Sequence, residues 1–151
     1  MDTARSKAFV SWNLCNSDIS GKIRISNQSG YSYFLTFIDD FLRFTTVYLI
    51  KEKSEIVKFF KEFKEMMENK FERKIAALRS DNGTEYRNLQ MVHFCKENGI
   101  RMEFTVPHSP QQNGVAERLN RTIDDMAKSL LIGARLPTRF WPEAIQAAVH
   151  I

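Results

Sequence analysis

The sequence predicts an α/β fold, with a mixed central sheet of about five strands flanked by helices. Short aromatic and β-branched segments alternate along the chain with segments whose apolar residues recur at helical spacing. The chain has 151 residues, of which 43% are hydrophobic and 26% charged, and this is enough for one domain with its own core. We find no internal repeat and no low-complexity segment, which excludes solenoid and disordered classes.

The first three segments are expected to be strands. An apolar segment that holds Asp18 comes first. Residues 33–38 and 44–50 are rich in aromatic and β-branched side chains, and the polar stretch 39–43 separates them. This arrangement predicts a β-hairpin.

The next segment changes to a helical pattern. From Ser54 to Met67 the apolar residues fall on one face, which predicts an amphipathic helix of roughly four turns with Ser54 as its N-cap. The short apolar run 75–78 predicts a buried strand, and the turn residues 79–83 follow it. Asp81 is therefore expected at the end of a strand.

The second half of the chain continues the alternation of helices and strands. Asn98 and Gly99 form a helix-ending signal. We expect, in order, a helix over 89–95, a strand over 100–106, a loop over 107–114, a long helix from 115 to 133 and a last helix over 141–151.

Composition limits the classes of partner. The net charge of +4 and the pI of about 9.1 fit a polyanion, but the charge is spread evenly, so a binding surface must be formed by folding. The longest stretch without charge, 25–38, is polar and too short to cross a membrane, and we see no secretory signal. Cys15 and Cys95 lack zinc-site spacing and are expected to be buried thiols.

Three carboxylates fall where folding can bring them together: Asp18, Asp81 and Glu117. Each alone has an ordinary explanation in turn formation or in helix electrostatics. Together they suit phosphoryl transfer with two Mg²⁺ or Mn²⁺ ions, because these ions prefer hard oxygen ligands.

The sequences around two of these carboxylates resemble a known family. Residues 79–86 read Arg-Ser-Asp-Asn-Gly-Thr-Glu-Tyr, residues 110–122 read Pro-Gln-Gln-Asn-Gly-Val-Ala-Glu-Arg-Leu-Asn-Arg-Thr, and 35 residues lie between Asp81 and Glu117. With the segments 33–40 and 136–144, they resemble the integrase core of the Pol polyprotein of copia-type LTR retrotransposons. The resemblance divides the chain into a divergent N-terminal segment, 1–17, and a single catalytic core domain, 18–151.

The resemblance implies a ribonuclease-H-like fold and a metal-dependent Asp, Asp, Glu triad that cleaves and joins DNA ends during integration. Asp81 and Glu117 match the family's second aspartate and its glutamate. Asp18 is the weaker match, because only Ser-Asp and Gly remain of the sequence motif that usually surrounds the family's first aspartate. Asp39 or Asp40 is the alternative candidate for this first aspartate. The resemblance also implies DNA as partner, a homo-oligomer when active, no membrane and a nuclear site of action.

The family's mobile loop and the start of the long helix imply a set of DNA-contacting residues: Gln112, Asn113, Gly114, Arg118 and Arg121. For Lys128 a local pair with Asp124 or Asp125 is the preferred explanation, and the three histidines are expected to be structural. Two alternatives stay open: a non-catalytic transposon-derived remnant with residual nucleic-acid binding, and a hydrolytic nuclease of the same fold.

Overall fold

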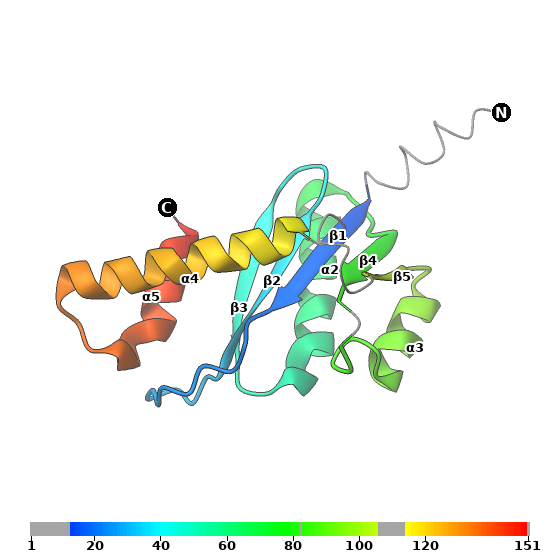
Figure 1. Cartoon of the computed structure of the whole chain (residues 1–151). Helices are drawn as coiled ribbons and strands as arrows, with labels where there is room; N and C mark the ends of the chain where they lie inside the picture. The colour runs from blue at the N-terminus through cyan, green and yellow to red at the C-terminus, as the bar shows by residue number, and fades with distance from the viewer. Residues whose placement is uncertain (1–12, 82, 106–113, 151) are drawn as a thin grey trace.

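The computed structural model describes residues 13–81, 83–105 and 114–150 (Figure 1). The strands are β1 Leu14–Ile19, β2 Tyr33–Asp39, β3 Thr45–Ile50, β4 Ala77–Ser80 and β5 Arg101–Phe104. The helices are α2 Ile56–Phe71, α3 Leu89–Glu97, α4 Gly114–Ala134 and α5 Trp141–Val149, with short 3-10 turns η1 Lys53–Glu55 and η2 Thr138–Phe140.

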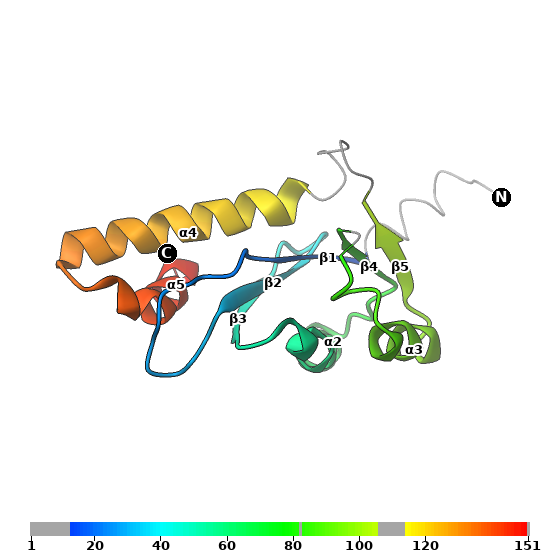
Figure 2. The same cartoon turned by 60° about the horizontal axis from the view of Figure 1, so that its bottom comes forward.

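The five strands form one mixed sheet in the order β3-β2-β1-β4-β5. The pairs β1–β2 and β2–β3 are antiparallel, while β1–β4 and β4–β5 are parallel. Helices α4 and α5 cover one face of the sheet, and α2 and α3 cover the other (Figure 2). The predicted fold class and the predicted hairpin are therefore confirmed.

Two hydrophobic clusters hold the layers together. Phe37 on β2 packs against Phe60 and Phe63 of α2, with ring centroids 5.6 and 5.2 Å apart. On the opposite face, the cluster under α4 and α5 contains the buried side chains Phe34, Ile123, Ala127, Leu131, Trp141, Ala144, Ile145 and Ala148. Burial of these apolar faces is the main force that fixes the helices to the sheet.

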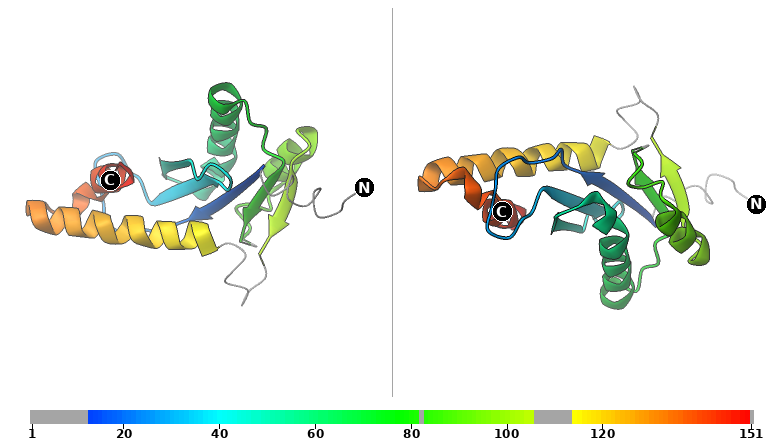
Figure 3. Two further views of the ribbon diagram at one scale, coloured as in Figure 1. Left: turned by 90° about the horizontal axis from the view of Figure 1, so that it is seen from above. Right: turned by 90° about the horizontal axis from the view of Figure 1, so that it is seen from below.

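Side chains of β1 alternate between the two faces, as the pleat of a strand requires. Cys15 belongs to the cluster on the α2 and α3 side. Asn16 and Asp18 therefore point toward the α4 side. Figure 3 shows α4 passing along the sheet and continuing beyond it beside α5.

Most element boundaries agree with the sequence pattern, and a few are corrected. Ser54 is not an N-cap, because it lies inside the 3-10 turn η1, whose N-cap is Glu52. The Glu55 carboxylate accepts the backbone amides of Lys51 and Glu52 at 2.6 and 3.0 Å and so stabilises the start of this turn. The fourth strand begins at Ala77, two residues later than expected.

Several predictions concern residues outside the described ranges, namely Gln112, Asn113 and most of the loop 107–114. The domain boundary after residue 17 also stays a prediction, although β1 spans it. Cys15 and Cys95 are free and buried, as expected. Among the described helices, none combines the length and the apolar character needed to cross a membrane.

Candidate active site

Asp18 and Asp81 lie at the ends of neighbouring parallel strands. Asp18 is near the end of β1, and Asp81 directly follows β4. The strand register places Asn16 opposite Arg79. Continuing it by two residues brings Asp18 level with Asp81, at the edge of the sheet where parallel strands end.

Glu117 approaches Asp18 from another element. It lies in the first turn of α4 and is exposed. The pKa of Asp18 is raised from 3.8 to about 7, first by burial and then by the charges of Glu117 and Asp81. Asp18 is therefore within electrostatic reach of both other predicted carboxylates.

Asn120 is a further residue of the site that was not singled out from the sequence. It is buried on α4, and its Nδ2 donates a hydrogen bond of 2.9 Å to Asp18 Oδ2. Its Oδ1 accepts a hydrogen bond from the Thr36 hydroxyl on β2. The available signal was its position three residues after Glu117, because this spacing places both side chains on neighbouring positions of one helix face.

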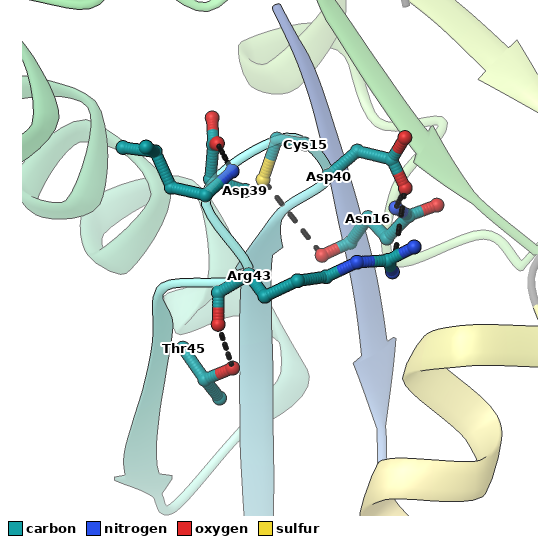
Figure 4. A network of polar contacts seen from close by, with 7 residues as sticks. Cys15, Asn16, Asp39, Asp40, Arg43 and Thr45 are labelled. Carbon is teal, nitrogen blue, oxygen red and sulfur yellow. Dashed lines mark hydrogen bonds and ion pairs between the residues drawn. The ribbon is translucent and has the colours of Figure 1, made fainter. Parts of the chain in front are cut away.

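Asp39, the competitor of Asp18, has a structural role at the β2–β3 turn (Figure 4). Its Oδ2 accepts the backbone amide of Leu42 at 2.7 Å, and its Oδ1 pairs with Arg73 Nε at 3.4 Å. Because Asp39 lies opposite Cys15 in the register, it faces α2 and α3 rather than α4. It therefore lies on the opposite side of the sheet from Asp18.

Asp40 is held by two other partners at the same turn. The Asn16 amide donates to its Oδ1 at 3.1 Å, and the Arg43 guanidinium lies 3.6 Å away (Figure 4). These contacts give the Asp40 carboxylate a structural role in the turn, so its presence there does not require a function beside Asp81.

The turn after β4 holds Asp81 in place. Asp81 Oδ1 accepts a hydrogen bond of 2.9 Å from the Gly83 amide, and the Gly83 carbonyl accepts one of 3.2 Å from the Tyr86 amide. Such a bond from an aspartate to the backbone two residues on is typical of this residue type in turns. Within the described ranges, no hydrogen bond to the second carboxylate oxygen of Asp81 accompanies it.

A cavity of about 570 Å³ extends from Asp18 and Asn120 along α4. Its inner wall is apolar and includes Phe34, Leu131 and Trp141. Its charged lining residues are Asp18, Lys22, Arg121, Asp124 and Lys128.

The cations of α4 differ in their partners. Lys128 pairs with Asp124 at 2.8 Å, as expected, and this hydrogen bond raises the pKa of Lys128. Arg118 and Arg121 are exposed beside Glu117, and the structure shows no ion pair between either guanidinium and a described carboxylate. Gly114 is the buried first residue of α4.

The donor set suits a hard divalent cation. It consists of carboxylate oxygens, which Mg²⁺ and Mn²⁺ prefer. The pKa of Asp18 is raised first by burial and then by repulsion from Glu117 and Asp81, and a bound cation would relieve this repulsion. Within the described ranges, however, no three His, Cys, Asp or Glu side chains are gathered closely enough to hold a metal ion. In this structure the described carboxylates do not form a complete set of metal ligands.

Comparison with known proteins identifies the family of the chain. Residues 12–110 match the integrase core domain family. The chain is 45% identical over 139 residues to the retrovirus-related Pol polyprotein from transposon TNT 1-94 of Nicotiana tabacum, covering 92% of this chain and 10% of that polyprotein. It is 38% identical over 127 residues to the corresponding polyprotein from transposon RE2 of Arabidopsis thaliana, covering 84% of this chain and 9% of that one. The chain thus spans about a tenth of these relatives.

Two solved structures share the fold. The simian T-cell lymphotropic virus intasome, in complex with PP2A regulatory subunit B56 gamma, aligns with a TM-score of 0.68 at 18% identity, over 91% of this chain and 46% of that chain. The HTLV-2 integrase catalytic core domain in complex with magnesium, in a trimeric form, aligns with a TM-score of 0.63 at 19% identity, over 91% of this chain and 82% of that chain. Retroviral integrase cores have the ribonuclease-H-like fold, and this chain shares it. From its sequence match and its fold together, the chain belongs to the integrase core domain family.

Proposed function

We propose that this chain is the catalytic core of a retrotransposon integrase, a metal-dependent polynucleotidyl transferase that cleaves DNA ends and joins them to target DNA. The observation that carries the proposal is the position of Asp18 and Asp81 at the ends of adjacent parallel strands, with Glu117 in the first turn of α4 close enough for its charge to act on Asp18. Membership of the integrase core family supports it.

The three carboxylates would hold two Mg²⁺ or Mn²⁺ ions. The chemistry supplied by bound ions of this kind is activation of the attacking oxygen and stabilisation of the leaving oxygen in a phosphodiester. Asp18, Asp81 and Glu117 supply hard oxygen ligands, and the Asn120 amide fixes the orientation of Asp18. The similar HTLV-2 core was solved in complex with magnesium, which supports this choice of ion.

The basic residues beside the carboxylates would bind the DNA backbone. Arg118 and Arg121 are exposed on the first turns of α4 and would neutralise phosphates without reading the bases. Gln112 and Asn113 are proposed to contact DNA near the scissile phosphate, with Gly114 as the hinge of their loop.

Assembly and location belong to the same proposal. Strand transfer requires two DNA ends to be held together, so we propose that the active form is a homo-oligomer that acts in the nucleus. The similarity to an intasome and to a trimeric catalytic core supports oligomer formation. We propose residues 18–151 as the catalytic core and 1–17 as a divergent N-terminal segment.

The test is an assay with labelled duplex DNA ends and Mn²⁺, comparing the wild type with Glu117→Gln. The matched control is Asp125→Asn, which removes an exposed carboxylate from the same helix outside the proposed triad. Joined product that Glu117→Gln abolishes and Asp125→Asn retains would support the integrase.

Two other outcomes would replace the proposal. Cleavage without joined product would indicate a hydrolytic nuclease. Absence of metal-dependent nicking would indicate a non-catalytic remnant, an alternative favoured by the altered sequence around Asp18.

A further inference from the structure

A pair of buried hydroxyl groups links β1 to the turn that follows β4. Ser17 Oγ lies 2.9 Å from Tyr86 Oη, and both residues are fully buried. Ser17 directly precedes Asp18, and Tyr86 lies five residues after Asp81. The bond therefore joins the two segments that carry the proposed aspartate ligands.

The same bond completes a continuous series of contacts. The Asp81 carboxylate accepts from the Gly83 amide, the Gly83 carbonyl accepts from the Tyr86 amide, and the Tyr86 hydroxyl bonds to Ser17. This series leads from one proposed ligand to the residue beside the other. Any shift of the turn against β1 must break one of its bonds.

The bond also lies where the backbone pairing of the two strands ends. The β1–β4 register runs from Leu14 opposite Ala77 to Asn16 opposite Arg79. Asp18 and Asp81 lie two residues beyond this last pair. The Ser17–Tyr86 bond extends the connection between the strands toward the carboxylates.

Packing of the ring does not by itself explain the hydroxyl of Tyr86. The ring belongs to the core between the sheet and helices α2 and α3, where a phenylalanine ring would occupy the same space. A buried hydroxyl is unfavourable unless it is hydrogen-bonded. Burial raises the pKa of Tyr86 well above its usual value, and the charges of Asp18, Asp81 and Glu85 raise it too, so the hydroxyl stays neutral beside the site.

We propose that Tyr86 is a positioning residue, which sets the spacing of Asp18 and Asp81 through Ser17. The role rests on the proposed function, because this spacing matters only if both carboxylates bind metal. The Ser17 side chain faces α2 and α3 and the Asp18 side chain faces α4, so fixing the backbone at Ser17 fixes the point from which Asp18 extends. Mg²⁺ demands near-ideal octahedral geometry, whereas Ca²⁺ accepts flexible geometry. Altered spacing should therefore weaken Mg²⁺ binding more than Ca²⁺ binding.

The test is titration calorimetry of the full chain with Mg²⁺ and with Ca²⁺, comparing the wild type with Tyr86→Phe. We expect Mg²⁺ affinity to fall at least about fivefold and Ca²⁺ affinity less than about twofold. The control Tyr48→Phe also removes one tyrosine hydroxyl, on β3, and keeps a ring that stacks on Phe59 at 4.7 Å. This control should leave both affinities unchanged.

A double variant tests whether both hydroxyls act through one bond. Ser17→Ala combined with Tyr86→Phe removes both hydroxyls of the bond, so its Mg²⁺ affinity should match that of Tyr86→Phe. Recovery of Mg²⁺ affinity in the double variant, or an unchanged ratio of Mg²⁺ to Ca²⁺ affinity in Tyr86→Phe, would overturn the role.

Asp18→Asn distinguishes failure of this inference from failure of the proposed function. If Asp18→Asn loses Mg²⁺ binding while Tyr86→Phe keeps the wild-type ratio, only the positioning role is overturned. If the wild type shows no Mg²⁺ binding that depends on Asp18, the metal-dependent function fails and the positioning role fails with it.

Discussion

The side-chain amide of Asn120 donates a hydrogen bond of 2.9 Å to Asp18 Oδ2, although the two residues lie 102 positions apart in the sequence. The other end of the amide accepts from the Thr36 hydroxyl, so the amide is held at both ends. It cannot rotate without leaving a buried polar group unpaired. This contact fixes α4 relative to β1 at the site.

We predict that Asn120→Leu lowers Mg²⁺ affinity about 10- to 100-fold, because partners that orient metal ligands typically contribute that much. Thr36→Val keeps the side-chain shape and removes only the hydroxyl, so it should have a smaller effect in the same direction. Calorimetric titration with Mg²⁺ measures both. Wild-type affinity in Asn120→Leu would show that the amide does not orient Asp18.

Asp18→Asn is expected to stabilise the metal-free protein at neutral pH. The pKa of Asp18 is raised from 3.8 to about 7 in the folded protein. Between about pH 4 and about pH 7, Asp18 therefore holds a proton in the folded state that it releases in the unfolded chain. Stability therefore falls as pH rises from about 4 to about 7. The variant removes this loss, which is at most about 4 kcal/mol. Urea unfolding in EDTA should show the gain at pH 8 and none near pH 4; an equal gain at both values would contradict the prediction.

Asp39→Asn, in contrast to Asp18→Asn, is expected to destabilise the folded protein. It weakens the pairing of the buried carboxylate with Arg73, so we expect a loss of about 1–3 kcal/mol in the free energy of unfolding. Mg²⁺ affinity should be unchanged, because Asp39 lies on the other face of the sheet. Loss of Mg²⁺ binding at wild-type stability would instead assign Asp39 to the site.

Cys15 and Cys95 should resist alkylation in the folded protein. Burial raises the pKa of Cys95 to about 11, and burial followed by the Asp39 charge raises the pKa of Cys15 well above its usual value. Since the thiolate is the reactive form, about one Cys95 thiol in a thousand is ionised at pH 8. Mass spectrometry after iodoacetamide treatment should show no labelling of the folded chain and two labels in urea. Rapid labelling of the folded chain would contradict the burial.

Trp141 should be a major contributor to the cluster under α4 and α5. Its indole is buried, and its Nε1 donates to the Ile25 carbonyl at 3.1 Å. We expect Trp141→Ala to lower the free energy of unfolding by about 3–5 kcal/mol, and Trp141→Phe by about 1 kcal/mol. Chemical denaturation measures both. Ile132→Ala, at a side chain that is 78% exposed, is the control and should change stability by less than about 0.5 kcal/mol.

Local patterns predicted the elements better than the contacts between them. The hairpin, the stripe of α4 and the position of Asp81 after a strand follow from periodicity and turn residues within short windows. The N-cap was predicted wrongly, because a 3-10 turn begins before Ser54, at Lys53, with Glu52 as its N-cap and the Glu55 carboxylate accepting the Glu52 backbone amide.

The site was only partly predictable for a related reason. The matched sequence motifs predicted Asp81 and Glu117 as site residues, which stays a prediction. Choosing between Asp18 and Asp39 required knowing which face of the sheet each one occupies. Asn120 and Tyr86 could not be assigned partners from the sequence, because their bonds join residues 102 and 69 positions apart. The roles of Gln112 and Asn113 stay predictions.

The alternating direction of the β1 side chains determines which mutations this strand can tolerate. Cys15 and Ser17 point to the core on one side, and Asn16 and Asp18 point to the other side, so one six-residue strand serves both packing and chemistry. A point substitution alters one of these sets. Deletion of a single codon within β1 would exchange them, placing a carboxylate in the apolar layer and a core side chain at the site. Codon gains and losses in this strand should therefore be far more damaging than in the connection between β1 and β2.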